Sequence, residues 1–248
     1  MSSKFFRISV FAASIFIGAC NGSETKTVTE TDKMKSDSAM PAVSNEPAPT
    51  PSTIITTPLG MMIAKHRVTN FEKWKASYDA HDSLRLANGM HTYVIGRGAA
   101  DPNMVLVSVT VDDMAKAKAF AKDPSLKLAM QKGGVTGTPM IDFFTVMFRD
   151  TGAIRTTLRS ETVITVKDWT AWQTAFETGK QERMDNGIMI RAYGHDADNN
   201  NKVRIVAAIT DSAKAMAYWK SDMLKAKMAA SGVIGEPKRF LFNVVQRY

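Results

Sequence analysis

An internal duplication constrains the fold of this chain more than any other feature of its sequence. Shifted by 98 positions, residues 68–96 align with 166–194 without a gap, and residues 105–139 align with 203–237. Identical residues recur along both stretches and beyond them: Trp74/Trp172, Arg85/Arg183, Asn88/Asn186, Gly89/Gly187, Gly96/Gly194, Met130/Met228, Gly137/Gly235, Pro139/Pro237 and Arg149/Arg247. The chain therefore contains two copies of one structural unit.

Each copy predicts the element order β-α-β-β-α-β. In the first copy, "MMIAKHRV" (61–68) has the composition of a strand, and Asn70 precedes aromatic residues at helical spacing. Asn88 and Gly89 are typical of a helix C-terminus. Two further β-rich runs, "MHTYVIG" and "MVLVSVTV", are joined by the hairpin-type loop "RGAADPN".

The second half of each copy predicts another helix and a closing strand. In the first copy Asp112 and Asp113 open an Ala/Lys-rich helix, which Pro124 is expected to interrupt in this copy only. The segment "MIDFFTVMFR" closes the first unit, as "RFLFNVVQR" closes the second. In these strands apolar residues occupy both alternating sets of positions, and these sets point to opposite faces of the sheet. Both faces are therefore expected to be buried.

This order is the ferredoxin-like plan, an antiparallel four-stranded sheet with two helices on one face. Together with the Asn-Gly turn and the shared "M-x-x-x-G-V-x-G-x-P" segment (Met130 to Pro139), it resembles the dimeric α/β-barrel superfamily, which includes antibiotic-biosynthesis-monooxygenase-like domains. The resemblance implies an α+β fold in which tandem repeats, residues 60–150 and 151–248, pack as a pseudo-dimeric barrel. Because that barrel closes within one chain, we expect a monomer.

The N-terminus predicts export and lipid anchoring. Lys4 and Arg7 precede a short apolar run, "ISVFAASIFI", which is too short to span a bilayer. The run ends in "IGAC", where Cys20 is the only cysteine of the chain. This segment resembles the lipobox of bacterial lipoproteins, which implies a signal peptide over 1–19, lipidation of Cys20 and attachment to the cell envelope, on the outer membrane.

The segment after the cysteine predicts a flexible linker over residues 20–59. It is rich in Ser, Thr, Glu, Lys and Pro and almost free of aromatic side chains, so it cannot bury enough apolar surface to fold. The remainder, 60–248, carries 27 basic and 19 acidic residues. A basic surface on an exported protein favours anionic small molecules, lipid headgroups or envelope polymers rather than nucleic acid.

One stripe of the first predicted helix suggests a ligand pocket. Trp74, Tyr78, His81 and Arg85 follow one another at steps of four, three and four residues, which places them on one helix face. A change from aromatic to basic residues along that stripe suggests a pocket mouth, with Tyr93 as a further ligand-binding candidate. The alternative for Arg85 is a structural interaction with the last helix carbonyls, because Arg183 repeats it.

The histidines suggest a single pocket in the first repeat. No two of the four occupy equivalent positions of the two copies. In the alignment of the repeats, His66, His81, His91 and His195 correspond to Ile164, Gly179, Met189 and Arg97. A duplicated metal site is therefore not expected. His66 and His91 could serve as general bases near neutral pH, or they could be ordinary buried or solvent-facing residues.

Other motif searches exclude several kinds of site. The sequence contains no H-E-x-x-H, paired-cysteine, phosphate-loop or G-x-S-x-G pattern, and its "MVLVSVTV" strand lacks the aromatic signature of RNA-binding domains. We therefore expect no metal, no cofactor and no nucleic-acid partner.

Three functions remain open at this point. The first is binding of a small aromatic or anionic molecule in a pocket of the first repeat. The second, implied by the resemblance, is a cofactor-independent monooxygenase-like or isomerase-like enzyme with His91 or His66 as base and Arg85 holding the developing anion. The third is an envelope interaction protein without a ligand.

Overall fold

Both repeats fold in the predicted order in the computed structural model, which describes residues 52–248. The first repeat contains β1 (Ile54–Ile55), β2 (Leu59–Val68), α1 (Phe71–Ala80), α2 (Asp82–Ala87), β3 (Met90–Gly98), β4 (Met104–Val111), α3 (Met114–Phe120), α4 (Pro124–Lys132) and β5 (Val135–Asp150). The second contains β6 (Leu158–Val166), α5 (Trp169–Thr178), α6 (Lys180–Asp185), β7 (Ile188–Asp196), β8 (Lys202–Ile209), α7 (Ser212–Lys220), α8 (Asp222–Ala230) and β9 (Val233–Arg247).

The folded part begins earlier than the expected boundary at residue 60. Ile54 and Ile55 pair with the end of β5 as the short strand β1, and β2 begins at Leu59. Two consecutive β-branched residues suit an edge strand, so these residues of the expected linker belong to the sheet. The signal segment 1–19, the lipidation site Cys20 and the linker before residue 52 lie outside the described residues.

Each predicted helix consists of two shorter helices, and the expectation that only the first repeat interrupts its second helix was wrong. Pro124 begins α4 after Asp123, as expected. In the second repeat Ser221 adopts an extended backbone between α7 and α8, and its hydroxyl accepts a hydrogen bond from the backbone N–H of Leu224 at 3.2 Å. A serine N-cap therefore interrupts the helix there without a proline.

The strands of residues 52–248 form one closed antiparallel sheet. Its order is β1-β5-β2-β4-β3-β9-β6-β8-β7, and an additional pairing of β5 with β7 closes it. The two junctions are equivalent under the duplication, because Val94 faces Arg247 in one and Ala192 faces Arg149 in the other. The predicted pseudo-dimeric α/β barrel is confirmed.

Close backbone packing at these junctions explains one of the identical residue pairs. A Cβ atom on Gly96 would lie 2.3 Å from the ring of Phe242, and one on Gly194 would lie 2.0 Å from the carbonyl oxygen of Thr145. No side chain fits at either position, so both copies require glycine where their sheets join.

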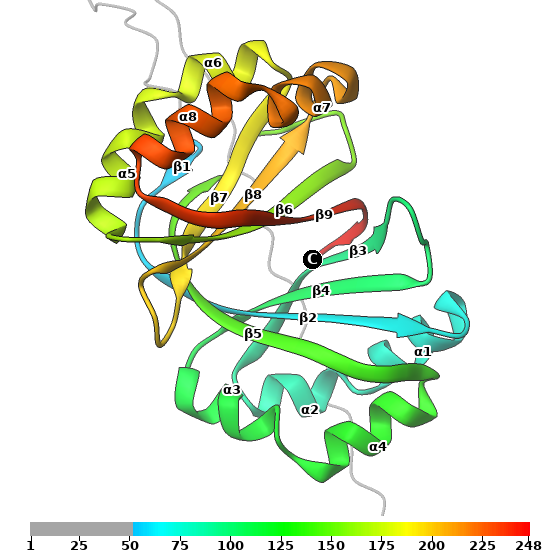
Figure 1. The fold of residues 1–248 in the computed structure, drawn as a ribbon. Helices are drawn as coiled ribbons and strands as arrows, with labels where there is room; N and C mark the ends of the chain where they lie inside the picture. Colours follow the sequence, from blue (N-terminus) through cyan, green and yellow to red (C-terminus); the bar gives the residue numbers. More distant parts are fainter. Residues whose placement is uncertain (1–51) are drawn as a thin grey trace, which may run out of the picture. The chain divides into compact units, whose positions relative to one another are not determined.

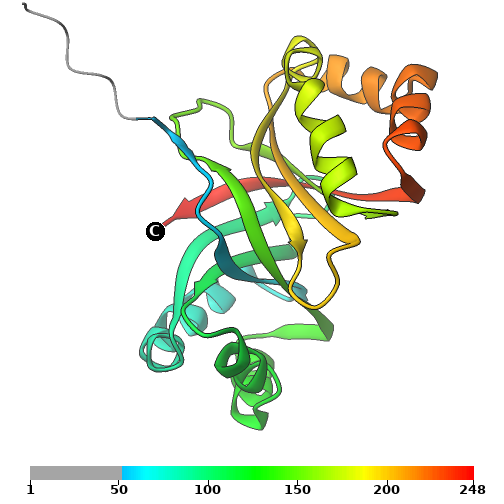
Figure 2. The same ribbon diagram turned by 90° about the vertical axis from the view of Figure 1, so that its left-hand side faces the viewer.

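Helices cover the outside of the barrel, and apolar side chains fill much of its inside. Helices α1–α4 lie against the strands of the first repeat and α5–α8 against those of the second (Figures 1 and 2). Along β2, Met62 packs toward the helices, whereas Met61 and Ile63 pack into the barrel with Phe144 and Phe242. Both faces of the sheet are therefore buried, as the sequence predicted.

Candidate functional site

A small cavity lies between the sheet of the first repeat and the helices that cover it. It has a volume of about 70 Å³, and its lining is almost entirely apolar. The lining comes from β2, β3, β4 and all four helices of the repeat. Four of the five predicted ligand-binding residues line it: Trp74, Tyr78, His81 and Arg85, together with the predicted base His66.

His66 is the most unusual polar group of this cavity. It lies on β2 on the helix-facing side with Met62 and Ala64, and only 4% of its surface is exposed. Neither ring nitrogen has a hydrogen-bond partner among the described residues. Burial lowers the pKa of His66 to about 4, so the imidazole is neutral at pH 7.

Aromatic side chains form the wall next to His66. The His66 ring lies 5.5 Å from the Trp74 ring between centroids, and Trp74 stacks on Tyr78 at 5.1 Å. The Tyr78 hydroxyl lies 2.8 Å from Oγ1 of Thr92. Burial is the main cause that raises the pKa of Tyr78 to about 12, so this phenol stays protonated. The cavity thus offers aromatic surface and, on His66, one free hydrogen-bond donor and one free acceptor.

His81 and Arg85 mark the break between α1 and α2. His81 is the residue between the two helices, and its Nδ1 lies 2.6 Å from the carbonyl oxygen of Ser77. Arg85 donates from Nη1 to the carbonyl oxygen of Tyr78 at 2.6 Å and from Nη2 to Asp82 at 2.9 Å. Its guanidinium also lies over the Tyr78 ring, 3.6 Å from the centroid.

Arg183 repeats this arrangement in the second copy. It donates from Nη1 to the carbonyl oxygen of Phe176 at 2.7 Å and lies over that ring at 3.8 Å. Because both repeats use the arginine in this way, the structural alternative considered for Arg85 accounts for its position. Its terminal nitrogens already have partners within the protein.

The structure does not bring His91 or Tyr93 to this cavity. The Nε2 atom of His91 pairs with Asp112 at 2.9 Å, and about half of its side chain is exposed. Tyr93 packs on the opposite face of the sheet, where it lines a cavity inside the barrel. Of the two predicted bases, only His66 lies in a cavity with the predicted ligand-binding residues.

The second repeat has a larger cavity in the equivalent place. It has a volume of about 390 Å³, and Trp172, Phe176 and Arg183 line it where the first repeat has Trp74, Tyr78 and Arg85. Three lining residues are smaller in the second repeat: Ser160, Gly179 and Ala207 replace Met62, His81 and Val109. Two are larger, since Thr162 and Ile205 replace Ala64 and Val107. Our search for histidines missed this cavity, although these replacements are visible in the aligned repeats.

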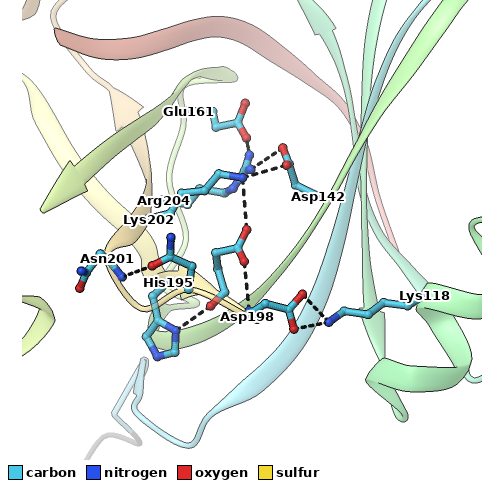
Figure 3. A network of polar contacts seen from close by, with 10 residues as sticks. Lys118, Asp142, Glu161, His195, Asp198, Asn201, Lys202 and Arg204 are labelled. Atoms are coloured by element: carbon cyan, nitrogen blue, oxygen red, sulfur yellow. Dashed lines mark hydrogen bonds and ion pairs between the residues drawn. The ribbon is translucent and has the colours of Figure 1, made fainter. Parts of the chain in front are cut away.

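The barrel interior also holds buried charges that the sequence analysis missed. Glu161 on β6 is 1% exposed and contacts Lys65, at 2.6 Å, and Arg204. Arg204 also binds Asp142 at 2.7 Å, and Lys202 bridges Asp142 and Asp196 (Figure 3). None of these six charges is repeated by the duplication, which leaves no pattern to detect. Their aligned residues are Ile63, Val163, Leu106, Phe240, Met104 and Gly98 for Glu161, Lys65, Arg204, Asp142, Lys202 and Asp196.

Two further negative observations apply to residues 52–248. They contain no group of three or more His, Cys, Asp or Glu side chains placed to hold a metal ion. None of their helices combines the length and apolar character that a membrane-spanning helix needs.

Comparison with solved structures supports the fold. A candidate monooxygenase from Fusobacterium nucleatum subsp. nucleatum matches with a TM-score of 0.52 and 14% identity, over 77% of this chain and 94% of that one. An anthrone oxidase-like protein matches with a TM-score of 0.54 and 15% identity, over 79% of this chain and 95% of that one. No family model matches the sequence, and no curated protein matches it.

At these identities the structural matches establish the fold. The chain is similar to monooxygenase-like proteins of the dimeric α/β-barrel type along most of both chains. The particular reaction has to be argued from the residues of the cavities.

Proposed function

We propose that this protein is a cofactor-independent, monooxygenase-like enzyme that acts on a small aromatic ketone or phenol in the first-repeat cavity. One observation carries the proposal: the neutral imidazole of His66 is buried beside aromatic rings with both nitrogens unpartnered. A buried polar group without a partner is costly, and a ligand hydrogen-bonded to it would remove that cost. The fold shared with a candidate monooxygenase supports the same reading.

His66 would act as the proton acceptor. Burial holds its pKa at about 4, but a substrate anion formed beside the ring would favour the charged imidazolium and raise that pKa. An electron-rich carbanion or phenolate can then react with dioxygen. For anthrone, one substrate and one dioxygen give one anthraquinone and one water: the reacting carbon loses two hydrogens and gains one oxygen.

The lining would have to open to admit even one aromatic ring, and much further for the three fused rings of anthrone, because a cavity of about 70 Å³ is smaller than one of about 150 Å³ that can hold benzene. Met62, Met90 and Met130 supply flexible side chains for this adjustment. The second repeat shows that this arrangement of helices and sheet can enclose about 390 Å³ with other side chains in the lining.

Oxygen uptake with anthrone as substrate tests the proposal. We choose anthrone because one of the matched structures is an anthrone oxidase-like protein. Substitution His66→Ile introduces the residue that the second repeat has at Ile164, so the fold tolerates it. The wild type should consume oxygen and form anthraquinone, and His66→Ile should lower kcat/KM by roughly 10²–10⁴-fold.

The variant His91→Gln is the matched control, because His91 lies outside the cavity. It should keep wild-type kcat/KM. Uptake no faster than the spontaneous oxidation of anthrone, or full activity in His66→Ile, would contradict the enzymatic proposal.

A second candidate function, binding without turnover, is favoured by the larger cavity of the second repeat. Its volume of about 390 Å³ lies in the usual range for small-molecule sites, and it contains no histidine. Quenching of tryptophan fluorescence by anthraquinone, lost in Ala207→Phe but retained in His66→Ile, would support this function. Quenching lost only in His66→Ile would support the first-repeat cavity.

We also propose that Cys20 is lipidated and holds the protein on the cell envelope, with the segment before it removed. The support is the sequence alone: a charged start, a short apolar run and a lone cysteine. Cell fractionation with a clickable palmitate analogue tests it. The wild type should be labelled and sediment with membranes, whereas Cys20→Ala should be unlabelled; a labelled Cys20→Ala protein would contradict the proposal.

A further inference from the structure

A separate cavity inside the barrel is lined by four arginines. It has a volume of about 360 Å³ and lies on the opposite face of the sheet from His66. The linker between β5 and β6, residues 151–157, contributes Thr151, Gly152, Ala153 and Ile154 to its lining. The arginines come from the ends or interiors of four strands: Arg149 on β5, Arg159 on β6, Arg191 on β7 and Arg247 on β9.

Positive charge in this cavity exceeds negative charge. Asp150 is its one acidic lining residue within residues 52–248, and it pairs with Arg191 at 2.8 Å. Arg159, 3% exposed, donates from Nη1 to the carbonyl oxygens of Thr156, at 2.7 Å, and Leu158, at 2.9 Å. Four guanidinium groups against one carboxylate leave an excess of three positive charges.

The unpaired charge is specific to this end of the barrel. Two residues further along β6, Glu161 belongs to the network in which three cations, on Lys65, Lys202 and Arg204, meet three carboxylates, on Glu161, Asp142 and Asp196. The charges are therefore balanced at one end of the barrel, whereas the arginine end carries an excess of positive charge. Of the four arginines Arg159 is buried, Arg149 and Arg191 are half-buried and Arg247 is exposed, so an anion from solvent could reach them and pair with the excess charge.

Two details show that the arginines have unused hydrogen-bonding capacity and lie close enough to affect one another. The Nε atom of Arg149 is buried without a hydrogen-bond partner among the described residues. Burial first, and then the positive charges of Arg247 and Arg191, lower the pKa of Arg159 to about 10. An anion among these groups would accept hydrogen bonds from them and remove the repulsion.

We propose that this cavity binds a small organic molecule with two negative charges, such as a dicarboxylate, on an aromatic or apolar body. The excess of positive charge favours an anionic ligand over a neutral one. Tyr93, Phe144 and Phe242 line the same cavity and would contact the apolar body. The volume suits a molecule of one or two rings.

Titration calorimetry with phthalate, a dicarboxylate on one aromatic ring, tests the site at low ionic strength. The wild type should bind phthalate more tightly than it binds inorganic phosphate or benzyl alcohol. The variants Arg149→Gln and Arg247→Gln should each weaken phthalate binding roughly tenfold or more, because each removes a charged hydrogen-bond donor. Their melting temperatures without ligand should be unchanged or higher, because the repulsion is reduced.

The matched control is Arg155→Gln, which removes the same charge from an exposed position in the same linker, outside the cavity lining. It should bind phthalate like the wild type. An equal loss in Arg155→Gln would show a general charge effect and overturn the site, as would a failure of phthalate to bind. Tighter binding of phosphate than of phthalate would overturn the apolar part of the proposal.

This site does not depend on the function proposed for the first repeat. The variant His66→Ile should leave phthalate binding unchanged, because His66 lies on the helix-facing side of β2. Loss of anthrone oxidation and loss of phthalate binding can therefore be observed separately.

Discussion

His66 shows how one residue can differ between two copies of a fold that otherwise match. Its equivalent in the second repeat is Ile164, an ordinary core residue. A strand position that accepts isoleucine in one copy gives the histidine of the other an apolar environment, with Met62 and Trp74 as neighbours. The imidazole is kept neutral by that environment and not by a charged partner.

The stability of the protein should therefore depend on pH through His66. The pKa is about 4 when folded and near 6.5 when unfolded, so between these values only the unfolded chain takes up the proton. The free energy of unfolding should fall as pH drops from about 6.5 to 4, by roughly 3 kcal/mol in total. Urea denaturation of wild type and His66→Ile at pH 7.5 and 4.5 measures it. Equal losses in both proteins would show that His66 is not the source.

The buried carboxylate of Glu161 should also be essential for stability. Glu161→Gln leaves Lys65 and Arg204 without their common partner inside the barrel, which should cost about 3–5 kcal/mol. Asp198→Asn makes the same chemical change in an exposed pair with Lys118 and should cost less than about 1 kcal/mol. Chemical denaturation compares them; similar costs for the two variants would refute the importance of the buried network.

At the scale of helices, the break between α1 and α2 is a feature of both repeats. The residue between the two helices differs, since it is His81 in one copy and Gly179 in the other. In both copies, however, an arginine of the second helix donates a hydrogen bond to a backbone carbonyl of the first helix. The arginine therefore has a role in the helix pair that does not require the histidine.

Arg85→Gln and Arg183→Gln should consequently destabilise the protein by similar amounts, about 1.5–3 kcal/mol each. Both lose a charged hydrogen bond to a backbone carbonyl and the contact with an aromatic ring. Thermal denaturation measures the two costs. A large loss of anthrone oxidation in Arg85→Gln with no loss of stability would show that Arg85 holds the substrate anion instead.

The element order was predictable from the sequence because each helix and strand could be predicted independently from two aligned copies. The β-α-β-β-α-β order, the apolar character of both sheet faces and the closure of the barrel follow from patterns present in both copies. The helix break at Ser221 was missed because we looked for proline, and a serine N-cap gives a weaker signal. Residues 54 and 55 were assigned to the linker because a two-residue strand is too short to show alternation.

The candidate site was only partly predictable. Trp74, Tyr78, His81 and Arg85 do line one cavity, but the prediction placed them on one continuous helix face, whereas α1 ends before His81 and Arg85 lies on α2. His91 was included because it lies on a neighbouring strand, but strand neighbours alternate between the two faces and their exposure depends on the rest of the fold. The barrel cavity and its arginines depend on which strands meet at the junctions, which spacing alone does not specify.

For the whole molecule, closure of the barrel within one chain leads us to expect a monomer. Strands β3 and β9, and β5 and β7, pair the sheets of the two repeats, so each repeat occupies the edges that a second chain would otherwise use. Sedimentation velocity should give a single species with the mass of one chain. A stable dimer at micromolar concentration would contradict this expectation.

The most direct test of the central claim is a crystal structure with 2-naphthol, an aromatic hydroxy compound, soaked into the protein. We predict density for the naphthol in the first-repeat cavity, beside Trp74 and Tyr78, with its oxygen within hydrogen-bond distance of a ring nitrogen of His66. Density confined to the second-repeat cavity, or a first-repeat cavity that stays closed at saturating naphthol, would contradict the claim that His66 faces a ligand.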